Sequence, residues 1–127
     1  MSTNQPPTEG FEAISWWYTR LSGILLILLL FGHLAIMHIL NTVFGISYRW
    51  VITERWAYLG WRIYDACVLW LGGLHALNGL RRVINDYVHR PGLNRVLKVA
   101  LVVLLIPVFI LGTIAVVGAP AIPAPDV

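Results

Sequence analysis

Residues 21–40, LSGILLILLLFGHLAIMHIL, form a run of twenty residues without a single Asp, Glu, Lys or Arg. An α-helix of that length is about 30 Å long, which matches the hydrocarbon thickness of a bilayer. The rest of the chain agrees, because 58% of its 127 residues are hydrophobic and only 12% are charged. A soluble domain of this size needs a more polar surface, so the sequence excludes an ordinary cytosolic enzyme and predicts an integral membrane protein.

Two further apolar stretches follow, and together the three predict an all-α membrane bundle of three transmembrane helices. We expect the spans at about residues 20–42, 56–82 and 95–118. The N-terminal residues are polar and lack the basic start of a secretory signal, which indicates a flexible tail. The chain is thus divided into an N-terminal cytoplasmic tail, 1–18, a membrane anchor domain, 19–118, and a C-terminal tail, 119–127.

The positions of the basic residues orient the predicted bundle. The connection between the first two spans carries only Arg49 and Arg55. Five basic residues surround the connection between the second and third spans: Arg81, Arg82, Arg90, Arg95 and Lys98. The positive-inside rule places these five in the cytoplasm, so we expect a multi-pass protein of the cytoplasmic membrane with its N-terminus inside and its C-terminus outside. Because the basic residues are spread among apolar segments, nucleic-acid binding is not expected.

Polar residues inside the spans require an explanation, since an ionisable group in hydrocarbon costs about 2.5 to 3.5 kcal/mol on insertion scales. Arg62 and Asp65 lie three residues apart near the outer end of the second span. We expect this pair to bind each other and reach the interface rather than to bind a substrate. The other candidates are Arg20, Ser22, His33, His75, Asp86 and Tyr87.

His75 is flanked on its helical face by glycines, in the stretch LWLGGLHALNGLRRV. Gly72 and Gly79 lie three residues before it and four residues after it, on the same side of a helix. Small residues at these positions allow either the close approach of a second helix or a flat slot in which a porphyrin lies while the imidazole binds iron. The spacing alone leaves both interpretations open.

Asp86 and Tyr87 lie about three helical turns after His75, at the predicted cytoplasmic boundary. A phenol at this depth is able to donate a hydrogen bond to a carbonyl of a lipid-soluble redox carrier. The alternative is a tyrosine of the aromatic belt beside a solvated aspartate, and the position alone favours that alternative.

The spacing of His75, Gly79 and Asp86-Tyr87, H-x3-G-x6-D-Y, resembles the second helix of the small hydrophobic membrane anchor of succinate dehydrogenase. Two more motifs are similar to the actinobacterial-like form of that anchor: R-x-S-G and G-H within residues 20–33, and R-W with LHALNGLRRVINDY within residues 55–87. The resemblance covers about residues 16–90, and the third predicted span adds only a suitable apolar helix.

The resemblance implies specific roles for five of the candidates. His75 is expected to be an axial ligand of haem b, with the second ligand from a histidine of the sister membrane anchor. Tyr87, helped by Asp86, is expected to hydrogen-bond a quinone carbonyl close to the iron–sulfur subunit. Arg20 and Ser22 resemble an Arg/Ser pair near the quinone and the haem propionates, a pair better known in the sister anchor.

His33 has two alternative roles. The resemblance implies that it is a ligand of a second haem, and the alternative is a hydrogen-bond donor to a neighbouring helix. His33 lies eleven residues after Ser22, and His75 lies eleven residues before Asp86. We therefore expect antiparallel helices to hold the imidazoles of His33 and His75 at a similar depth.

The predicted function is that of a membrane anchor and cytochrome b subunit of succinate:quinone oxidoreductase, which docks the flavoprotein and iron–sulfur arm and carries no catalytic residue for succinate oxidation itself. The alternatives are a non-redox membrane scaffold and the anchor of another bis-histidine membrane cytochrome. The sequence leaves open the choice between menaquinone and ubiquinone, the number of haems, the working direction and a higher oligomer of the complex.

Overall fold

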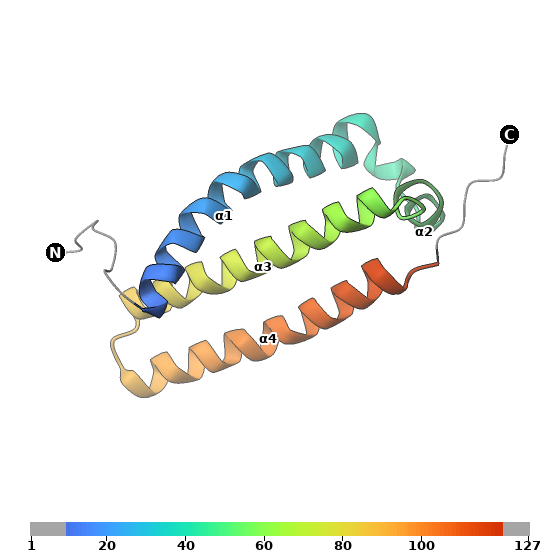
Figure 1. Cartoon of the computed structure of the whole chain (residues 1–127). Helices are drawn as coiled ribbons and strands as arrows, with labels where there is room; N and C mark the ends of the chain where they lie inside the picture. The colour runs from blue at the N-terminus through green and yellow to red at the C-terminus, as the bar shows by residue number, and fades with distance from the viewer. Residues whose placement is uncertain (1–9, 121–127) are drawn as a thin grey trace, which may run out of the picture.

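The computed structural model describes residues 10–120, and over that range the chain is helical without a β-strand. Three long helices account for most of it: α1 (Phe11–Leu34), α3 (Leu59–Tyr87) and α4 (Pro91–Gly118). Figure 1 shows these helices side by side, with α3 in the middle and packed against both neighbours. The start of α1, the end of α3 and the start of α4 lie at the same end of the bundle (Figure 1).

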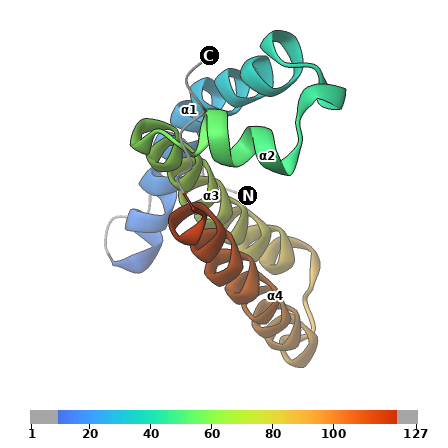
Figure 2. The same ribbon diagram turned by 90° about the vertical axis from the view of Figure 1, so that its right-hand side faces the viewer.

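Short helical segments connect α1 to α3 at the other end of the bundle. α1 continues directly into a π-helical turn, η1 (Ala35–Leu40). A 3-10 turn, η2 (Val43–Gly45), a turn of α-helix, α2 (Tyr48–Trp50), and a second π-helical turn, η3 (Val51–Arg55), then follow. Figure 2 shows this connection turning back toward the start of α3.

Two helical segments are long and apolar enough to cross a membrane, Phe11–Leu40 and α4. α3 is of comparable length, with 29 residues, but Asp65, His75 and Asn78 lower its mean hydropathy. The structure therefore confirms the prediction of an all-helical chain and provides two candidate spans. That α3 is a third span stays a prediction.

The outer faces of α1 and α4 are apolar and exposed. Leu28 and Leu104 are each 70% exposed, whereas the buried apolar residues among the described positions are Leu26, Ile52 and Val116. A soluble protein rarely leaves such extensive apolar surface in contact with water. These faces suit contact with membrane lipid or with other membrane helices.

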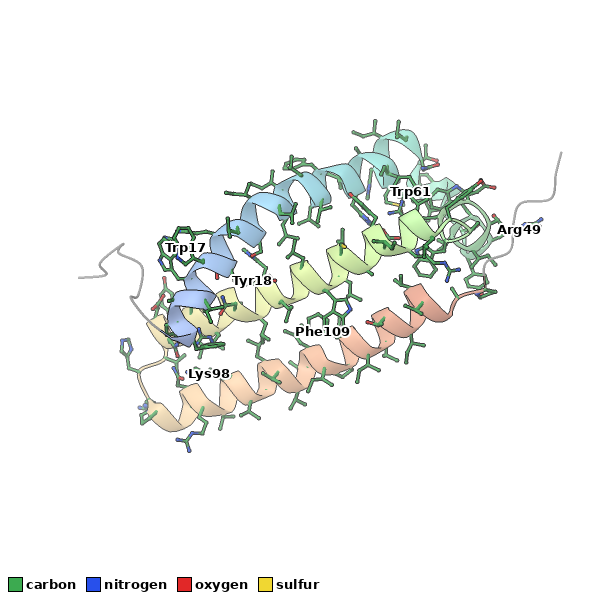
Figure 3. The ribbon with its side chains drawn as sticks, in the orientation of Figure 1. Trp17, Tyr18, Arg49, Trp61, Lys98 and Phe109 are labelled. Atoms are coloured by element: carbon green, nitrogen blue, oxygen red, sulfur yellow. The ribbon has the colours of Figure 1, made fainter. Side chains whose placement is uncertain are left out.

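Close contacts between glycines and large side chains join α3 to α4. A Cβ atom added to Gly73 would lie 2.5 Å from the ring of Phe109, and one added to Gly112 would lie 2.7 Å from Leu69. Phe109 points from α4 toward α3 (Figure 3), where its ring stacks on that of Trp70 with the centroids 4.6 Å apart. The absence of a side chain at Gly73 and Gly112 allows the two helices to approach this closely.

α1 begins earlier than predicted. Residues 11–18 belong to the helix and not to a flexible tail. The physical reason is a contact with α3 that the sequence pattern does not reveal: Ser15, only 4% exposed, donates a hydrogen bond of 2.6 Å to the side chain of Asn78. This contact holds the first turns of α1 against α3.

The other predicted boundaries differ by a few residues. α3 continues to Tyr87, past the predicted end at residue 82. α4 begins at Pro91, since proline lacks the N–H that the first turn of a helix leaves unpaired. Residues 1–9 and 121–127 of the predicted tails lie outside the described residues.

Candidate functional site

The side chain of His75 is held by Ser22, across the interface between α3 and α1. Ser22 Oγ lies 2.8 Å from Nδ1 of His75, and the serine is 3% exposed. A Cβ atom added to Gly23, the next residue of α1, would lie 3.4 Å from Cε1 of the same imidazole. The Nδ1–Cε1 edge of the ring therefore lies against α1.

The second ring nitrogen of His75, Nε2, has no hydrogen-bond partner among residues 10–120. One turn further along α3, a Cβ atom added to Gly79 would meet nothing within 4 Å, while one added to Gly72 would lie 3.7 Å from Leu26 of α1. The chain thus leaves open space beside His75 toward the end of α3 and fills the other side with α1. An imidazole with one nitrogen held and the other without a partner fits the requirements of a ligand to haem iron.

This chain offers one such ligand at His75. Within the described residues, no group of three His, Cys, Asp or Glu side chains gathers as it would around a metal ion.

Arg20 lies apart from Ser22, although the two are close in sequence. Its guanidinium carbon lies 3.5 Å from the ring centroid of Trp16 on an exposed part of α1. Two residues along a helix correspond to a rotation of about 200°, so Arg20 and the buried Ser22 occupy opposite faces. Figure 3 shows the same division for their neighbours, since Trp17 points away from α3 and Tyr18 points toward it.

Asp86 and Tyr87 form the exposed end of α3. Tyr87 is 80% exposed, and neither side chain has a hydrogen-bond or ion-pair partner within the described part of the chain. They lie about 16 to 18 Å from His75 along the helix axis, at a rise of about 1.5 Å per residue. The structure therefore brings Ser22 to His75 but brings neither Ser22 nor Arg20 to Tyr87.

His33 does not share the depth of His75, so the expectation of similar depth is wrong. His75 contacts Ser22, and His33 lies eleven residues further along α1, a separation of about 16 Å. The helices are therefore shifted relative to the predicted register, with Ser22 opposite His75 instead of opposite Asp86. His33 as a haem ligand stays a prediction.

The surroundings of His33 are charged. Its Nδ1 lies 3.5 Å from Asp65 Oδ1 and 3.5 Å from a guanidinium nitrogen of Arg55. Its ring is stacked parallel to that of Tyr64, with the centroids 6.3 Å apart. Nδ1 of His33 therefore already faces the ion pair of Arg55 and Asp65. This holds for both alternatives, a haem ligand and a partner of a neighbouring helix.

Asp65 pairs with Arg55, so the predicted pair of Arg62 and Asp65 is wrong. Arg55 donates two hydrogen bonds to the carboxylate, of 2.8 Å and 2.5 Å, and the indole N–H of Trp56 donates a third of 2.8 Å. A buried carboxylate needs a cation, and Arg55 is an available one in the sequence. Asp65 binds Arg55 and not Arg62 because η3 folds in a way that places Arg55 over α3.

Arg62 instead closes the end of α4. Its guanidinium donates to the carbonyls of Val116 and Val117, each at 3.1 Å, and to that of Ala119 at 2.7 Å. The last carbonyls of a helix have no partner within the helix and carry partial negative charge, which a guanidinium satisfies. This contact is structural and ties α4 to α3.

Sequence reasoning did not find a polar cluster between the start of α1 and the end of α3. Asn78 accepts from Ser15 and donates to Thr19 Oγ1 at 2.6 Å, and Arg81 forms an ion pair of 2.8 Å with Glu12. The available signal was an uncharged amide within an apolar stretch, which needs hydrogen-bond partners on a neighbouring helix. The cluster joins the start of α1 to the end of α3.

The comparison with protein families agrees with these observations. The family model of the succinate dehydrogenase/fumarate reductase transmembrane subunit matches residues 5–118. The chain belongs to this family. No curated protein matches the chain. Membership of the succinate dehydrogenase/fumarate reductase transmembrane subunits confirms the resemblance seen in the sequence, and it makes the chain a membrane subunit of an enzyme complex.

Proposed function

We propose that this chain is the membrane anchor and cytochrome b subunit of a succinate:quinone oxidoreductase, with haem b at His75 and the quinone at Tyr87. The observation that carries the proposal is the state of His75: Nδ1 is held by buried Ser22, whereas Nε2 has no partner among the described residues and open space lies beside Gly79. Bound haem supplies a one-electron carrier within the membrane.

The contribution of this chain at the haem is to hold and orient one ligand. α1 fixes the imidazole of His75 from one side, so the ring does not need to be ordered when iron binds. In this proposal the sister membrane anchor would provide the second histidine for the haem, because His33 lies about 16 Å along α1 from the level of His75.

The contribution at the quinone is a hydrogen-bond donor. The phenol of Tyr87 is exposed at the end of α3, and its hydroxyl has no hydrogen-bond partner among the described residues. A phenolic O–H donates to a quinone carbonyl oxygen, and the bond becomes stronger as negative charge develops on that oxygen. Asp86 shares this exposed end and provides an acceptor beside the phenol.

The same end of the bundle is where the catalytic arm is proposed to dock. The exposed Tyr87 lies next to the connection from α3 to α4, which contains Arg90, and Arg95 follows near the start of α4. In this proposal the iron–sulfur subunit binds at this end and delivers to the quinone the electrons that the flavoprotein subunit takes from succinate. The chain itself holds the acceptor and docks the arm.

The proposed membrane topology has three spans in the cytoplasmic membrane, with the N-terminus inside and the C-terminus outside. The polar groups of α3 support its place as the central span, because its neighbours satisfy them: Asp65 by Arg55, and Asn78 by Ser15. Within a bilayer, polar side chains are stable where other protein groups pair with them.

A reduced-minus-oxidised spectrum of the purified complex, with haem quantified per complex, tests the proposal. We expect b-type absorption in the wild type and its loss or strong perturbation in His75→Ala, because alanine cannot bind iron. His38→Ala is the matched control, since His38 is exposed in η1. A wild-type complex without haem, or an unchanged spectrum in His75→Ala, would contradict the haem assignment and favour a scaffold role.

A further inference from the structure

We propose that Ser22 is a positioning residue for His75 and not a ligand of the quinone. Its hydroxyl oxygen accepts the proton on Nδ1 of His75, which leaves the lone pair on Nε2 free for iron. This inference rests on the proposed function, because the choice of tautomer has a consequence only where His75 binds haem.

The direction of the hydrogen bond follows from what each group can donate. Ser22 Oγ lies 2.5 Å from the carbonyl oxygen of Tyr18 and 3.4 Å from that of Thr19. A carbonyl only accepts, and a serine hydroxyl has a single proton, so that proton goes to the nearer carbonyl of Tyr18. The remaining contact, 2.8 Å to Nδ1 of His75, then requires a proton on the imidazole.

This arrangement selects one of the two neutral tautomers of His75. With the proton on Nδ1, the nitrogen that lacks a proton is Nε2, which has no hydrogen-bond partner within residues 10–120. The opposite tautomer would place a proton on Nε2 and prevent it from binding iron. Ser22 therefore selects the form of the ring that is able to act as a ligand.

The hydrogen bond also sets the electron density on the ligand. A histidine that donates its second N–H is a stronger base toward iron, and a stronger base stabilises the ferric state. Ser22 is 3% exposed, so water does not readily replace its oxygen as the acceptor. We therefore expect Ser22 to lower the midpoint potential of the haem at His75.

A direct role in quinone binding does not fit the position of Ser22. The residue is level with His75, about 16 to 18 Å along the axis from Asp86 and Tyr87. Its oxygen is buried and already contacts both Tyr18 and His75. A quinone at Tyr87 would have to displace the contact between α1 and α3 to reach it.

The test compares three variants of the purified complex. Ser22→Ala removes the acceptor with little change in volume, and Ser22→Thr keeps a hydroxyl that is able to bond the same carbonyl. Thr19→Ala is the matched control, because Thr19 also lies on α1 and bonds to α3 but does not contact His75. The measurements are the haem midpoint potential, the electron paramagnetic resonance spectrum of the ferric haem, haem retention and succinate-to-quinone activity.

We expect Ser22→Ala to raise the midpoint potential, to shift the ferric spectrum and to weaken haem retention by about tenfold. Ser22→Thr should restore the wild-type values, and Thr19→Ala should keep them. Unchanged potential and spectrum in Ser22→Ala would overturn the inference, as would loss of haem from both Ser22 variants, which would indicate packing alone. Lower quinone reduction in Ser22→Ala with an unchanged potential would also overturn it and return Ser22 to the quinone site.

The two proposals fail in different ways. A wild-type complex without haem would refute the proposed function and this inference with it. A wild-type complex that loses its haem in His75→Ala but shows no change in Ser22→Ala would leave the proposed function standing and refute the role of Ser22.

Discussion

Arg55 and Asp65 are joined by two hydrogen bonds, and both side chains are shielded, with 3% and 10% of their surfaces exposed. Arg55 comes from η3, which precedes α3, and Asp65 lies in the second turn of α3. The pair therefore attaches the connection between α1 and α3 to the helix at the centre of the bundle. The pair stabilises the fold only when both partners are present, because either charge alone would be left in a poorly solvated site.

The first prediction concerns this ion pair. Asp65→Leu should destabilise the chain by about 3 to 5 kcal/mol, because it leaves the guanidinium of Arg55 buried without its anion. The double variant Arg55→Leu/Asp65→Leu should be less destabilised than the sum of the single variants. Thermal inactivation of the complex in detergent measures both effects, and strict additivity would contradict a direct interaction.

The second prediction concerns the open space beside His75. Gly79→Leu introduces a Cβ atom that should not disturb contacts within this chain, because nothing lies within 4 Å of it. It should nevertheless lower haem content severalfold if the porphyrin lies against this glycine. Gly72→Ala is the control, with its Cβ atom in ordinary contact with Leu26 at 3.7 Å. Full haem content in Gly79→Leu would place the porphyrin elsewhere.

The third prediction concerns Tyr87. Tyr87→Phe keeps the ring and removes only the donor, so succinate-to-quinone electron transfer should fall about tenfold, which corresponds to a hydrogen bond of about 1.4 kcal/mol. Haem content and electron transfer from succinate to a soluble artificial acceptor should stay near wild type. If quinone reduction is also unchanged, Tyr87 is an interfacial tyrosine and not a quinone ligand.

The fourth prediction separates His33 from His75. Because the two imidazoles differ in depth by about 16 Å, His33→Ala should leave the spectrum of the haem proposed at His75 unchanged. Pyridine haemochrome assay of haem per complex provides the measurement. Loss of half of the haem would identify His33 as the ligand of a second haem.

The fifth prediction concerns the contact between α3 and α4. Gly73→Ala should cost about 1 to 3 kcal/mol, because the new methyl group would lie 2.5 Å from the ring of Phe109. Gly60→Ala provides the control, since nothing lies within 4 Å of a Cβ atom there. The midpoint of thermal unfolding in detergent should fall for Gly73→Ala alone, and equal midpoints would show that α4 moves to accommodate the methyl group.

Hydropathy predicted the existence of the three long helices, because apolar runs of this length have few other stable structures. It also pointed to His75, whose position within an apolar stretch needs a reason. The contact between Ser22 and His75 was not predictable in the same way. A shift of one helix along another moves every facing pair, and hydropathy does not determine that shift.

Long-range polar contacts account for the remaining differences between the predicted and the observed structure. Asp65 had two possible cations nearby in sequence, Arg55 and Arg62, and the fold of a short connection determined which one it binds. The start of α1 likewise depends on Asn78, which lies 63 residues after Ser15. Local patterns carry no information about partners at such separations.

The modest hydropathy of α3 has a consequence for biogenesis. A helix that carries Asp65, His75 and Asn78 is a poor substrate for independent partitioning from the translocon into lipid. The helices that contact α3 are synthesised before and after it. Ser15 and Ser22 belong to α1, which is made first, and Phe109 belongs to α4, which is made last. Insertion of α3 is thus expected to be cooperative with α1, and a glycosylation-site mapping assay in microsomes should show α3 spanning efficiently only when α1 is present upstream.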